Sequence, residues 1–237
     1  MMNPLIKVLD HGHARLVDHM GNDLSVVRAA RVSYDADWRT GEDAGKDERL
    51  IDYLMRNRHT SPFEAVTFTF EIKAPIFVLR QWHRHRTQSY NEVSARYTEL
   101  PSEFYVPELD QITHQHSGNK QMRDDVQHPR AELIQAFMIN ANMDAHALYQ
   151  MLLANGVPRE LARTVLPLST YSRMFTTMNL HNLFHFLALR LHEHAQYEIR
   201  VFAEAMVDLI APVVPLSLAA FLKNQAAFEA ANEVTKA

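Results

Sequence analysis

Apolar and polar residues alternate most regularly over residues 64–73, where the pattern predicts a strand with one buried face. The apolar side chains on that face would be Val66, Phe68, Phe70 and Ile72. Shorter strands are expected near residues 6–9, 14–18 and 170–178, with a turn at His11-Gly12. Strands therefore fall mainly early in the chain.

Apolar stripes with the helical period predict most of the remaining elements. Helices are expected over residues 23–32, 46–57, 76–84, 129–154, 158–166, 180–210 and 216–230. Pro75 suits the first turn of the 76–84 helix, and Asn155-Gly156 is a common helix end. Polar, irregular segments are expected at 35–48 and 101–127. Early strands followed by many helices favour the α+β class, and the lack of a repeat or linker favours one domain over 1–237.

Two local patterns concern polar residues. On the 76–84 helix and its end, Gln81, Arg84 and His85 would share one face. Beyond it, alternation in an extended stretch would place three residues on one side: Glu92, Ser94 and Arg96. The scattered methionines are expected to fill the core. They are Met138, Met143, Met151, Met174, Met178 and Met206.

Composition narrows the possible functions. The 237 residues are 47% hydrophobic and 22% charged, with a net charge of −4, which is ordinary for a globular protein. A mildly acidic chain argues against broad nucleic-acid binding. No apolar run reaches membrane-spanning length, and the first residues lack the apolar core of a signal peptide. We therefore expect a cytoplasmic protein without a membrane or nucleic-acid partner.

Cysteine is absent, which excludes disulfides, thiolate metal sites and a thiol nucleophile. The 14 histidines invite a search for a metal site. The sequence holds no HExxH motif, and no carboxylate stands at a familiar ligand spacing. We therefore expect no metal.

Residues 80–96 reverse the charge of the chain. They contain four arginines and two histidines but a single acid, Glu92. A local reversal of this kind indicates an anionic ligand, and arginine can bind phosphate through two parallel hydrogen bonds. Internal salt bridges alone would leave too many of these guanidinium groups unpaired.

Arg190 raises a related question, because it follows Leu183 and Phe186 on the inward stripe of the 180–210 helix. A buried guanidinium must meet an anion or a ligand acceptor. We weigh a ligand role equally against a structural ion pair with Glu193 or Glu198.

Other residues have simple structural interpretations. Arg163 can be an exposed helix arginine, and His59 can be a surface histidine beside the turn before Pro62. Ser94 could be a nucleophile, but it lies outside any G-x-S-x-G motif.

Several motifs, in order, resemble one enzyme family. Arg84-His85-Arg86, followed by seven residues and Ser94, matches the RHR-x7-S signature of the flavin-dependent thymidylate synthases. The match widens to RQWHRHRTQSYNEVSARY, and HTSPFE upstream resembles the family's H-x-[TS]-P-F-E segment. Downstream, ARTVLPLSTYSRMF and LALRLHEHAQYE also resemble it. The resemblance runs from about His59 to Glu198.

The resemblance implies a fold and a reaction. The fold would be α+β, a twisted antiparallel sheet with a large helical bundle layer, assembled as a homotetramer with sites at subunit interfaces. The enzyme would make dTMP from dUMP, with methylenetetrahydrofolate as the one-carbon donor and NADPH as the reductant through FAD. The absence of cysteine is consistent with this chemistry, since the unrelated thymidylate synthase needs a thiolate.

The resemblance also implies residue roles. Positions that match dUMP contacts are Gln81, Arg84, Glu92, Ser94, Arg96, Arg163 and Arg190. Positions that match flavin contacts are Ser61, Arg84, His85, Arg86, Glu92, Asn179, His181 and His185. Arg190 would favour ionisation of the uracil at N3, and His59 would lie near the flavin. Arg190 and His59 are therefore the expected catalytic residues. At His185 many family members carry asparagine, so the chain departs from the family pattern at this expected flavin contact.

Two other functions stay open at this point. A different flavin or nucleotide enzyme could retain the scaffold; it would bind FAD without acting on dUMP. An RNA-binding protein would need exposed aromatic residues among the arginines. The candidates for such stacking are Trp82, Tyr90 and Tyr97, and we expect Trp82 to lie in the core.

Overall fold

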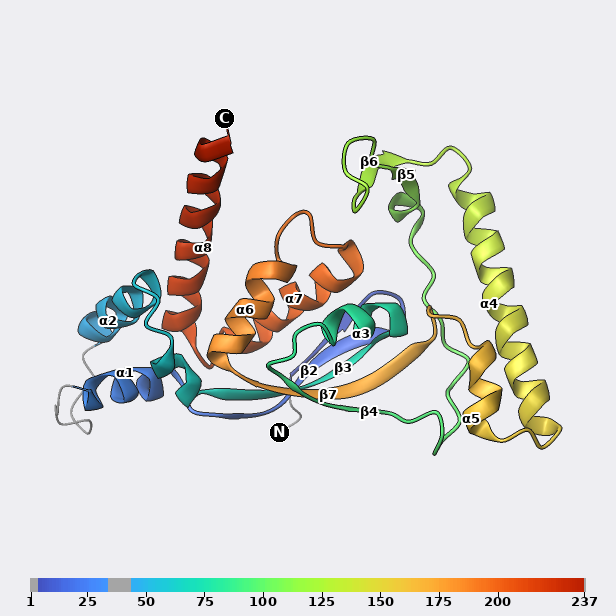
Figure 1. The fold of residues 1–237 in the computed structure, drawn as a ribbon, viewed down its shortest axis with the longest axis horizontal. Coiled ribbons are helices and arrows are strands. Elements are labelled where there is room, and N and C mark those ends of the chain that lie inside the picture. The colour runs from blue at the N-terminus through green and yellow to red at the C-terminus, as the bar shows by residue number, and fades with distance from the viewer. Residues whose placement is uncertain (1–3, 34–43, 237) are drawn as a thin grey trace.

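The computed structural model describes residues 4–33 and 44–236 (Figure 1). Most of the predicted polar segment 35–48 lies outside the described residues. The central element is a five-stranded antiparallel sheet with the order β1-β2-β3-β7-β4. Its strands are β1 (Leu5–Val8), β2 (Gly12–Met20), β3 (Thr67–Pro75), β7 (Tyr171–Asn179) and β4 (Ser89–Glu92). The predicted antiparallel sheet is therefore confirmed.

Strand β3 forms the centre of the core. Its side chains alternate between partly exposed and buried, and Phe68, Phe70 and Ile72 are fully buried. It pairs with β7 along its whole length, from Thr67 opposite Asn179 to Pro75 opposite Tyr171. The strand begins later than predicted, because Pro62 starts a short 3-10 helix, η1 (Ser61–Ala65).

Most helices lie on or beside this sheet (Figure 1). They are α1 (Asp23–Val32), α2 (Ala44–Arg56), α3 (Ile76–Trp82), α6 (Leu180–Arg190), α7 (Tyr197–Ile210) and α8 (Pro215–Lys236). Helix α7 packs on β1 and β2, whereas α6 packs on η1. Trp82 is fully buried as predicted, with its ring stacked 4.5 Å from that of Phe186.

The predicted 180–210 helix is wrong, because the chain leaves the helix after Arg190 and forms a second one from Tyr197. A turn between them is closed by His192, which accepts from the backbone N–H of His194 through Nδ1 and from that of Ala195 through its carbonyl. The two halves then pack against different elements. This break separates Arg190 from the helix that carries Glu198.

Two other segments differ from their predictions. The 101–127 segment is partly regular: it holds η2 (Leu109–Gln111) and a hairpin of β5 (Thr113–Gln115) and β6 (Arg123–Gln127). The 158–166 helix is instead two short pieces, α5 (Arg159–Ala162) and η3 (Arg163–Val165).

Helix α4 (Ala131–Ala154) lies apart from the sheet with α5 at its end (Figure 1). It exposes a set of large apolar side chains: Leu133, Phe137, Met138, Met143, Leu148 and Met151. Three of the methionines assigned to the core are therefore wrongly assigned, whereas Met174, Met178 and Met206 are buried. Among the helices in the described part of the chain, none is both long enough and apolar enough to cross a membrane.

Candidate active site

The end of α6 meets the loop that follows α3. Arg190 is the last residue of α6, and its Nε donates a hydrogen bond to Nε2 of His85 at 3.0 Å. His85 is buried, with 6% of its surface exposed, and its ring lies edge-on to Phe186. A buried imidazole therefore holds the guanidinium in place.

The protonation state of His85 follows from this setting. Burial lowers its pKa to about 4, and the positive charge of Arg190 acts in the same direction. The ring is therefore neutral near pH 7, and Nε2 keeps the lone pair that accepts from Arg190. Burial also lowers the pKa of Arg190, but a guanidinium stays charged at this pH.

The alternative of an ion pair between Arg190 and an acid of its own region is wrong. Glu193 lies 3.4 Å from Nε2 of His194, and Glu198 pairs with Arg123 at 2.7 Å. The predicted shared face of Gln81, Arg84 and His85 is also wrong, because α3 ends at Trp82. Arg84 is exposed, whereas His85 is buried.

A second group of predicted residues gathers at the end of β4. Glu92 and Ser94 line a cavity of about 370 Å³ together with Arg163. An adjoining cavity of about 470 Å³ is lined by Arg96, Arg163 and Glu160. Two segments separated by many residues therefore contribute to both cavities, and Arg163 lines each of them.

Simple alternation does not explain this gathering. Strand β4 ends at Glu92, and a turn follows in which the backbone N–H groups of Tyr97 and Thr98 donate to the carbonyl of Ser94. The Ser94 hydroxyl accepts from the N–H of Arg96 at 3.3 Å. Arg96 is exposed and faces Glu160 at 3.6 Å, a loose surface pair.

The remaining flavin candidates lie around η1 and the start of α6. His59 and Ser61 are exposed at the entry to η1. Asn179 caps α6, because its Oδ1 accepts from the N–H of Asn182 at 2.9 Å. His181 lies in the first turn of this helix and is partly exposed. Contact between α6 and η1 brings these two pairs of residues into one neighbourhood.

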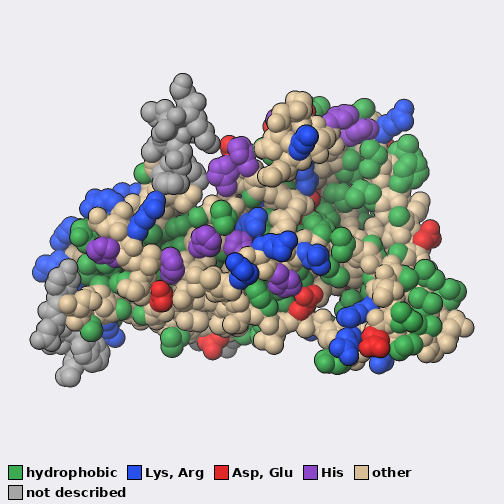
Figure 2. All heavy atoms as spheres, viewed as in Figure 1, with side chains coloured by type: hydrophobic (Ala, Val, Ile, Leu, Met, Phe, Trp, Pro, Cys, Tyr) green, Lys and Arg blue, Asp and Glu red, His purple; other side chains and the backbone are tan. Residues whose placement is uncertain are grey.

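Arg84 and Arg86 are exposed in the loop after α3, and within the described residues neither makes an ion pair. His185 is exposed on α6, with its ring 6.2 Å from that of His85. Figure 2 shows Lys, Arg and His side chains side by side across the middle of this face. The arrangement opposes the interpretation of the arginines as internal salt bridges.

The aromatic residues near these arginines do not form a stacking surface. Trp82 is buried, and the Tyr90 hydroxyl donates to the carbonyl of His85 at 2.7 Å. Tyr97 is 80% exposed and is left as a single candidate for stacking. The burial of Trp82 and the hydrogen bond of Tyr90 disfavour RNA binding.

Nothing in the described segments gathers three or more His, Asp or Glu side chains into a metal site.

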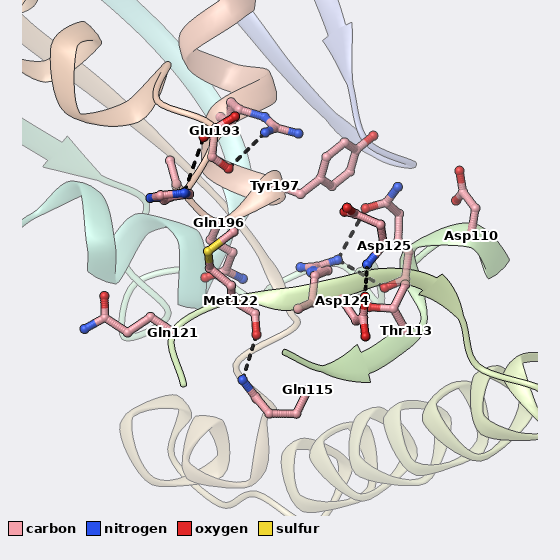
Figure 3. Close-up of a pocket in the computed structure, with 15 residues that line it drawn as sticks. Asp110, Thr113, Gln115, Gln121, Met122, Asp124, Asp125, Glu193, Gln196 and Tyr197 are labelled. Carbon is pink, nitrogen blue, oxygen red and sulfur yellow. Dashed lines mark hydrogen bonds and ion pairs between the residues drawn. The ribbon is translucent and has the colours of Figure 1, made fainter. Parts of the chain in front are cut away.

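Another cavity, of about 540 Å³, is lined by none of the predicted site residues. It lies between the β5–β6 hairpin, which contributes Thr113 and Asp124, and the 193–200 segment, which contributes Glu193 and Gln196 (Figure 3). Its lining mixes acids and bases, which suits no single charged ligand. One lining residue, Gln196, accepts a hydrogen bond from the Gln81 side chain.

Two residues that line this cavity, Arg123 and Gln196, and the buried Glu198 that both of them contact were not predicted as part of the site. The available signal was the Gln-x-Glu pattern at 196–198, where a buried acid opens a helix. This pattern carried no information about Arg123, because the contact between Arg123 and Glu198 depends on how the β5–β6 hairpin folds back onto α7.

Comparison with known proteins shows the family to which the chain is similar. The profile of the family described as thymidylate synthase complementing protein matches residues 15–216. Flavin-dependent thymidylate synthase of Thermus thermophilus is 50% identical over 93% of this chain and 80% of the relative. The protein of that name from Treponema denticola is 48% identical over 94% of this chain and 84% of its own.

A solved structure is similar over nearly its whole length. The UMP/dUMP methylase PolB from Streptomyces cacaoi, bound with 5-Br dUMP, has a TM-score of 0.84 and 39% identity, covering 92% of this chain and 97% of that one. The fold and site thus define a flavin-associated enzyme that transfers a methyl group. The chain belongs to the family of flavin-dependent thymidylate synthases.

Proposed function

We propose that this enzyme converts dUMP to dTMP, with methylenetetrahydrofolate as the one-carbon donor and NADPH as the reductant through bound FAD. The observation that carries the proposal is a pair of cavities beyond the end of β4: Arg163 lines both, with Glu92 and Ser94 in one and with Arg96 in the other. Because the chain has no cysteine, the pyrimidine must be activated without a thiolate.

Substrate binding is assigned to the exposed arginines and their neighbours. Arg96 and Arg163 bind the phosphate of dUMP, since their planar guanidinium groups suit a dianion and stay charged. Ser94 and Glu92 contact the rest of the nucleotide from the same cavity. Gln81 and Arg84 complete the set from the end of α3. The competing pair between Arg96 and Glu160 is weak enough to be displaced.

Ring activation is assigned to Arg190. A fixed cation beside the uracil favours the ionised form at N3, which lowers the pKa of that nitrogen. The hydrogen bond to neutral His85 orients the guanidinium before substrate arrives, so little reorganisation is needed during reaction. His59, exposed beside η1, is the other proposed catalytic residue.

The residues present fit a flavin dinucleotide, which supplies hydride from its reduced form when bound. Arg84 and Arg86 are exposed and outside the ion pairs of the described residues, so they can bind its phosphates. Further polar side chains lie around η1 and the start of α6, which are in contact. The proposed FAD contacts are Ser61, Arg84, His85, Arg86, Glu92, Asn179, His181 and His185. His185 can donate a hydrogen bond where many relatives use asparagine.

We also infer that 1–237 forms one unit that assembles as a homotetramer with shared sites. The exposed apolar face of α4 supports self-association, because Phe137 and Met143 are 62% and 56% exposed. A stable, flavin-loaded and active monomer in light scattering would contradict this assembly.

The proposed function is tested by the absorbance spectrum of the purified protein under anaerobic conditions. A flavin spectrum should bleach with NADPH and return only when dUMP and methylenetetrahydrofolate are both added. UMP should be offered in place of dUMP, since the methylase similar to this chain is named for both nucleotides. Recovery of the spectrum with neither nucleotide, or a protein that cannot be loaded with FAD, would overturn the proposal. A protein that binds FAD but ignores dUMP would favour a different flavin enzyme.

A further inference from the structure

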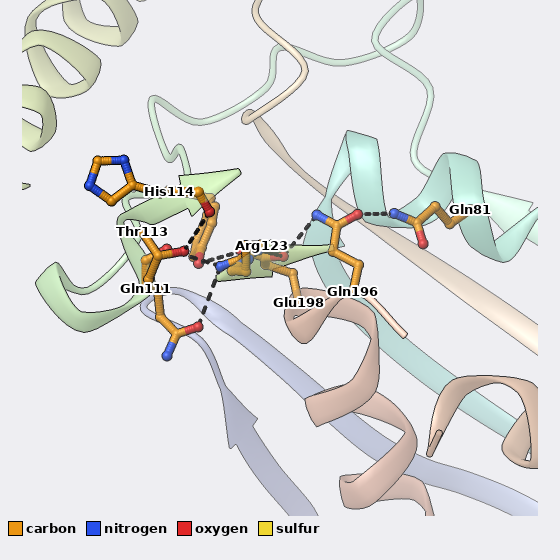
Figure 4. A network of polar contacts seen from close by, with 8 residues as sticks. Gln81, Gln111, Thr113, His114, Arg123, Gln196 and Glu198 are labelled. Carbon is orange, nitrogen blue, oxygen red and sulfur yellow. Dashed lines mark hydrogen bonds and ion pairs between the residues drawn. The ribbon is translucent and has the colours of Figure 1, made fainter. Parts of the chain in front are cut away.

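A chain of polar side chains runs from the β5–β6 hairpin to the end of α3 (Figure 4). Its centre is Glu198, in the first turn of α7 and 3% exposed. Nη2 of Arg123 lies 2.7 Å from both carboxylate oxygens of Glu198. On the other side, Nε2 of Gln196 donates to Oε2 of Glu198 at 2.8 Å. Oε1 of Gln196 in turn accepts from Nε2 of Gln81.

The charge of Glu198 is set by these contacts. Burial alone would raise the pKa of the carboxyl, but the hydrogen bonds and charge of Arg123 outweigh it and hold the pKa below its ordinary value. The Tyr105 hydroxyl adds a further donor, at 3.1 Å from Oε1. Glu198 is therefore ionised, and an ionised carboxylate can only accept hydrogen bonds.

Because the Glu198 carboxylate can only accept hydrogen bonds, it fixes the orientation of two side-chain amides. Gln196 must turn its NH₂ group toward Glu198, which leaves its carbonyl oxygen facing Gln81. Gln81 must then turn its own NH₂ group toward Gln196. The carbonyl oxygen of Gln81 is consequently directed away from Gln196 and the other side chains of this network. A flip at any link would set two donors or two acceptors against each other.

We propose that Glu198 is a positioning residue for the nucleotide: through Gln196 it fixes the Gln81 amide so that its carbonyl oxygen accepts from a donor of the bound substrate. The inference rests on the proposed function, in which Gln81 binds dUMP. Discrimination follows from the same geometry, since a fixed acceptor favours a ligand that carries an N–H or O–H at that point.

Arg123 connects the β5–β6 hairpin to this network of side chains. Its Nη2 binds Glu198, and its Nη1 donates to the carbonyl of Gln111 at 3.1 Å. The same guanidinium therefore keeps Glu198 ionised and ties the hairpin to α7. Loss of Arg123 would leave a buried carboxylate without its cation, which is costly.

Glu198→Gln is the direct test, because it keeps the shape of the side chain but can both donate and accept. The orientation of Gln196 is then no longer dictated. In FAD-loaded protein we expect the Kd for dUMP in calorimetry, and its KM, to rise about tenfold, with kcat changed less than twofold. Asp47→Asn is the matched control: it removes another buried carboxylate that pairs with an arginine, Arg31 at 2.6 Å, on helices outside this chain of contacts. Its dUMP affinity should stay at the wild-type value.

A double-mutant cycle separates positioning from general damage. If Glu198 acts through Gln81, the effect of Glu198→Gln on dUMP affinity should vanish in a Gln81→Ala background. Additive losses in the double variant would overturn the inference. Should Glu198→Gln fail to fold, Gln196→Ala removes the middle link and leaves the Arg123–Glu198 pair in place; the same tenfold rise is expected.

Failure of this inference can be told from failure of the proposed function. Wild-type protein that binds no dUMP in calorimetry would contradict the proposed function. Wild-type binding with unchanged affinity in the folded Glu198→Gln and Gln196→Ala variants would overturn the positioning role alone.

Discussion

Two cationic regions of this enzyme are built in opposite ways. Arg190 is half-buried, and its guanidinium is held by a hydrogen bond of 3.0 Å to a buried, neutral imidazole. Arg96 and Arg163 are exposed on the other side of the site, and the contact of Arg96 with Glu160 is a loose 3.6 Å. The difference suits the roles proposed for them: Arg190 would act at one atom of the uracil ring, whereas Arg96 and Arg163 would bind a phosphate.

The physical reasons for the two designs differ. Electrostatic assistance to a reaction depends on groups oriented before the charge develops. Arg190 is oriented by its hydrogen bond to His85, whose buried ring packs edge-on against Phe186. A phosphate dianion is attracted from a distance and accepts hydrogen bonds in many directions, so mobile surface arginines can bind it. Substitutions on the two sides should therefore affect different steps.

The largest effect is expected from Arg190→Ala. Removing a pre-oriented cation from the ring should lower kcat by about 100- to 1,000-fold, while the flavin content in the absorbance spectrum stays the same. Leu189→Ala, on the exposed face of the same helix, is the control and should keep normal turnover. A near-normal kcat in Arg190→Ala would show that Arg190 does not activate the ring, and the proposed difference between the two cationic regions would fail.

His85 should make the free energy of unfolding depend on pH in the acid range. Its pKa of about 4 in the folded protein lies below the ordinary value of 6.5, so the unfolded chain binds the extra proton first. This contribution to stability is present above pH 6.5 and is lost as the pH falls toward 4, on the order of 3 kcal/mol in all. Denaturant unfolding at several pH values checks it.

The control for that titration is His85→Gln, whose amide carbonyl can accept from Arg190 without titrating. Between pH 6.5 and 4 wild type should lose stability relative to this variant. Parallel pH profiles for the two proteins would show that His85 is not the buried neutral group described.

Arg96→Ala should act on the exposed side by weakening substrate binding. The Kd for dUMP should rise about 30-fold, as expected for a lost charge-assisted hydrogen bond to phosphate, with a smaller change in kcat. Arg159→Ala provides a matched control, since this arginine is also exposed on α5 and pairs loosely with Glu99 at 3.5 Å. Unchanged dUMP affinity in a folded Arg96→Ala protein would remove the phosphate role.

Glu160→Gln is expected to have the smallest effect on both stability and dUMP affinity. Surface pairs of this geometry contribute little, so the free energy of unfolding should change by less than about 0.5 kcal/mol. Affinity for dUMP should stay equal or improve up to about threefold, because a competing carboxylate loses its charge. A marked loss of affinity would mean that Glu160 holds Arg96 in place, and the contrast with Arg190 would disappear.

The local elements were largely predictable from sequence. Helix α1 has the predicted bounds, because Asn22 and Ser25 form a reciprocal cap at its start. Strand β3 shows the predicted alternation, since its partners on both sides leave one face to the core. Gly156, in the left-handed conformation at φ +78, ends α4 as its residue type suggests.

The relations between elements were not predictable. The break after Arg190 contains neither Gly nor Pro, so the sequence of 191–196 carries no stop signal. The meeting of Arg163 with Ser94 depends on how the segments after β4 and α4 fold back, which spacing cannot express. The same holds for Arg123 and Glu198. The motif resemblance named both His85 and Arg190, but it did not predict that neutral His85 accepts a hydrogen bond from Arg190.

Product formation is the decisive measurement for the proposed conversion of dUMP to dTMP. Purified, FAD-loaded protein should be given dUMP, methylenetetrahydrofolate and NADPH, and the nucleotide should be analysed by chromatography. We expect dTMP to form in proportion to the NADPH consumed, and none to form when dUMP is left out. Consumption of NADPH without any dTMP, from protein that is folded and carries flavin, would contradict it.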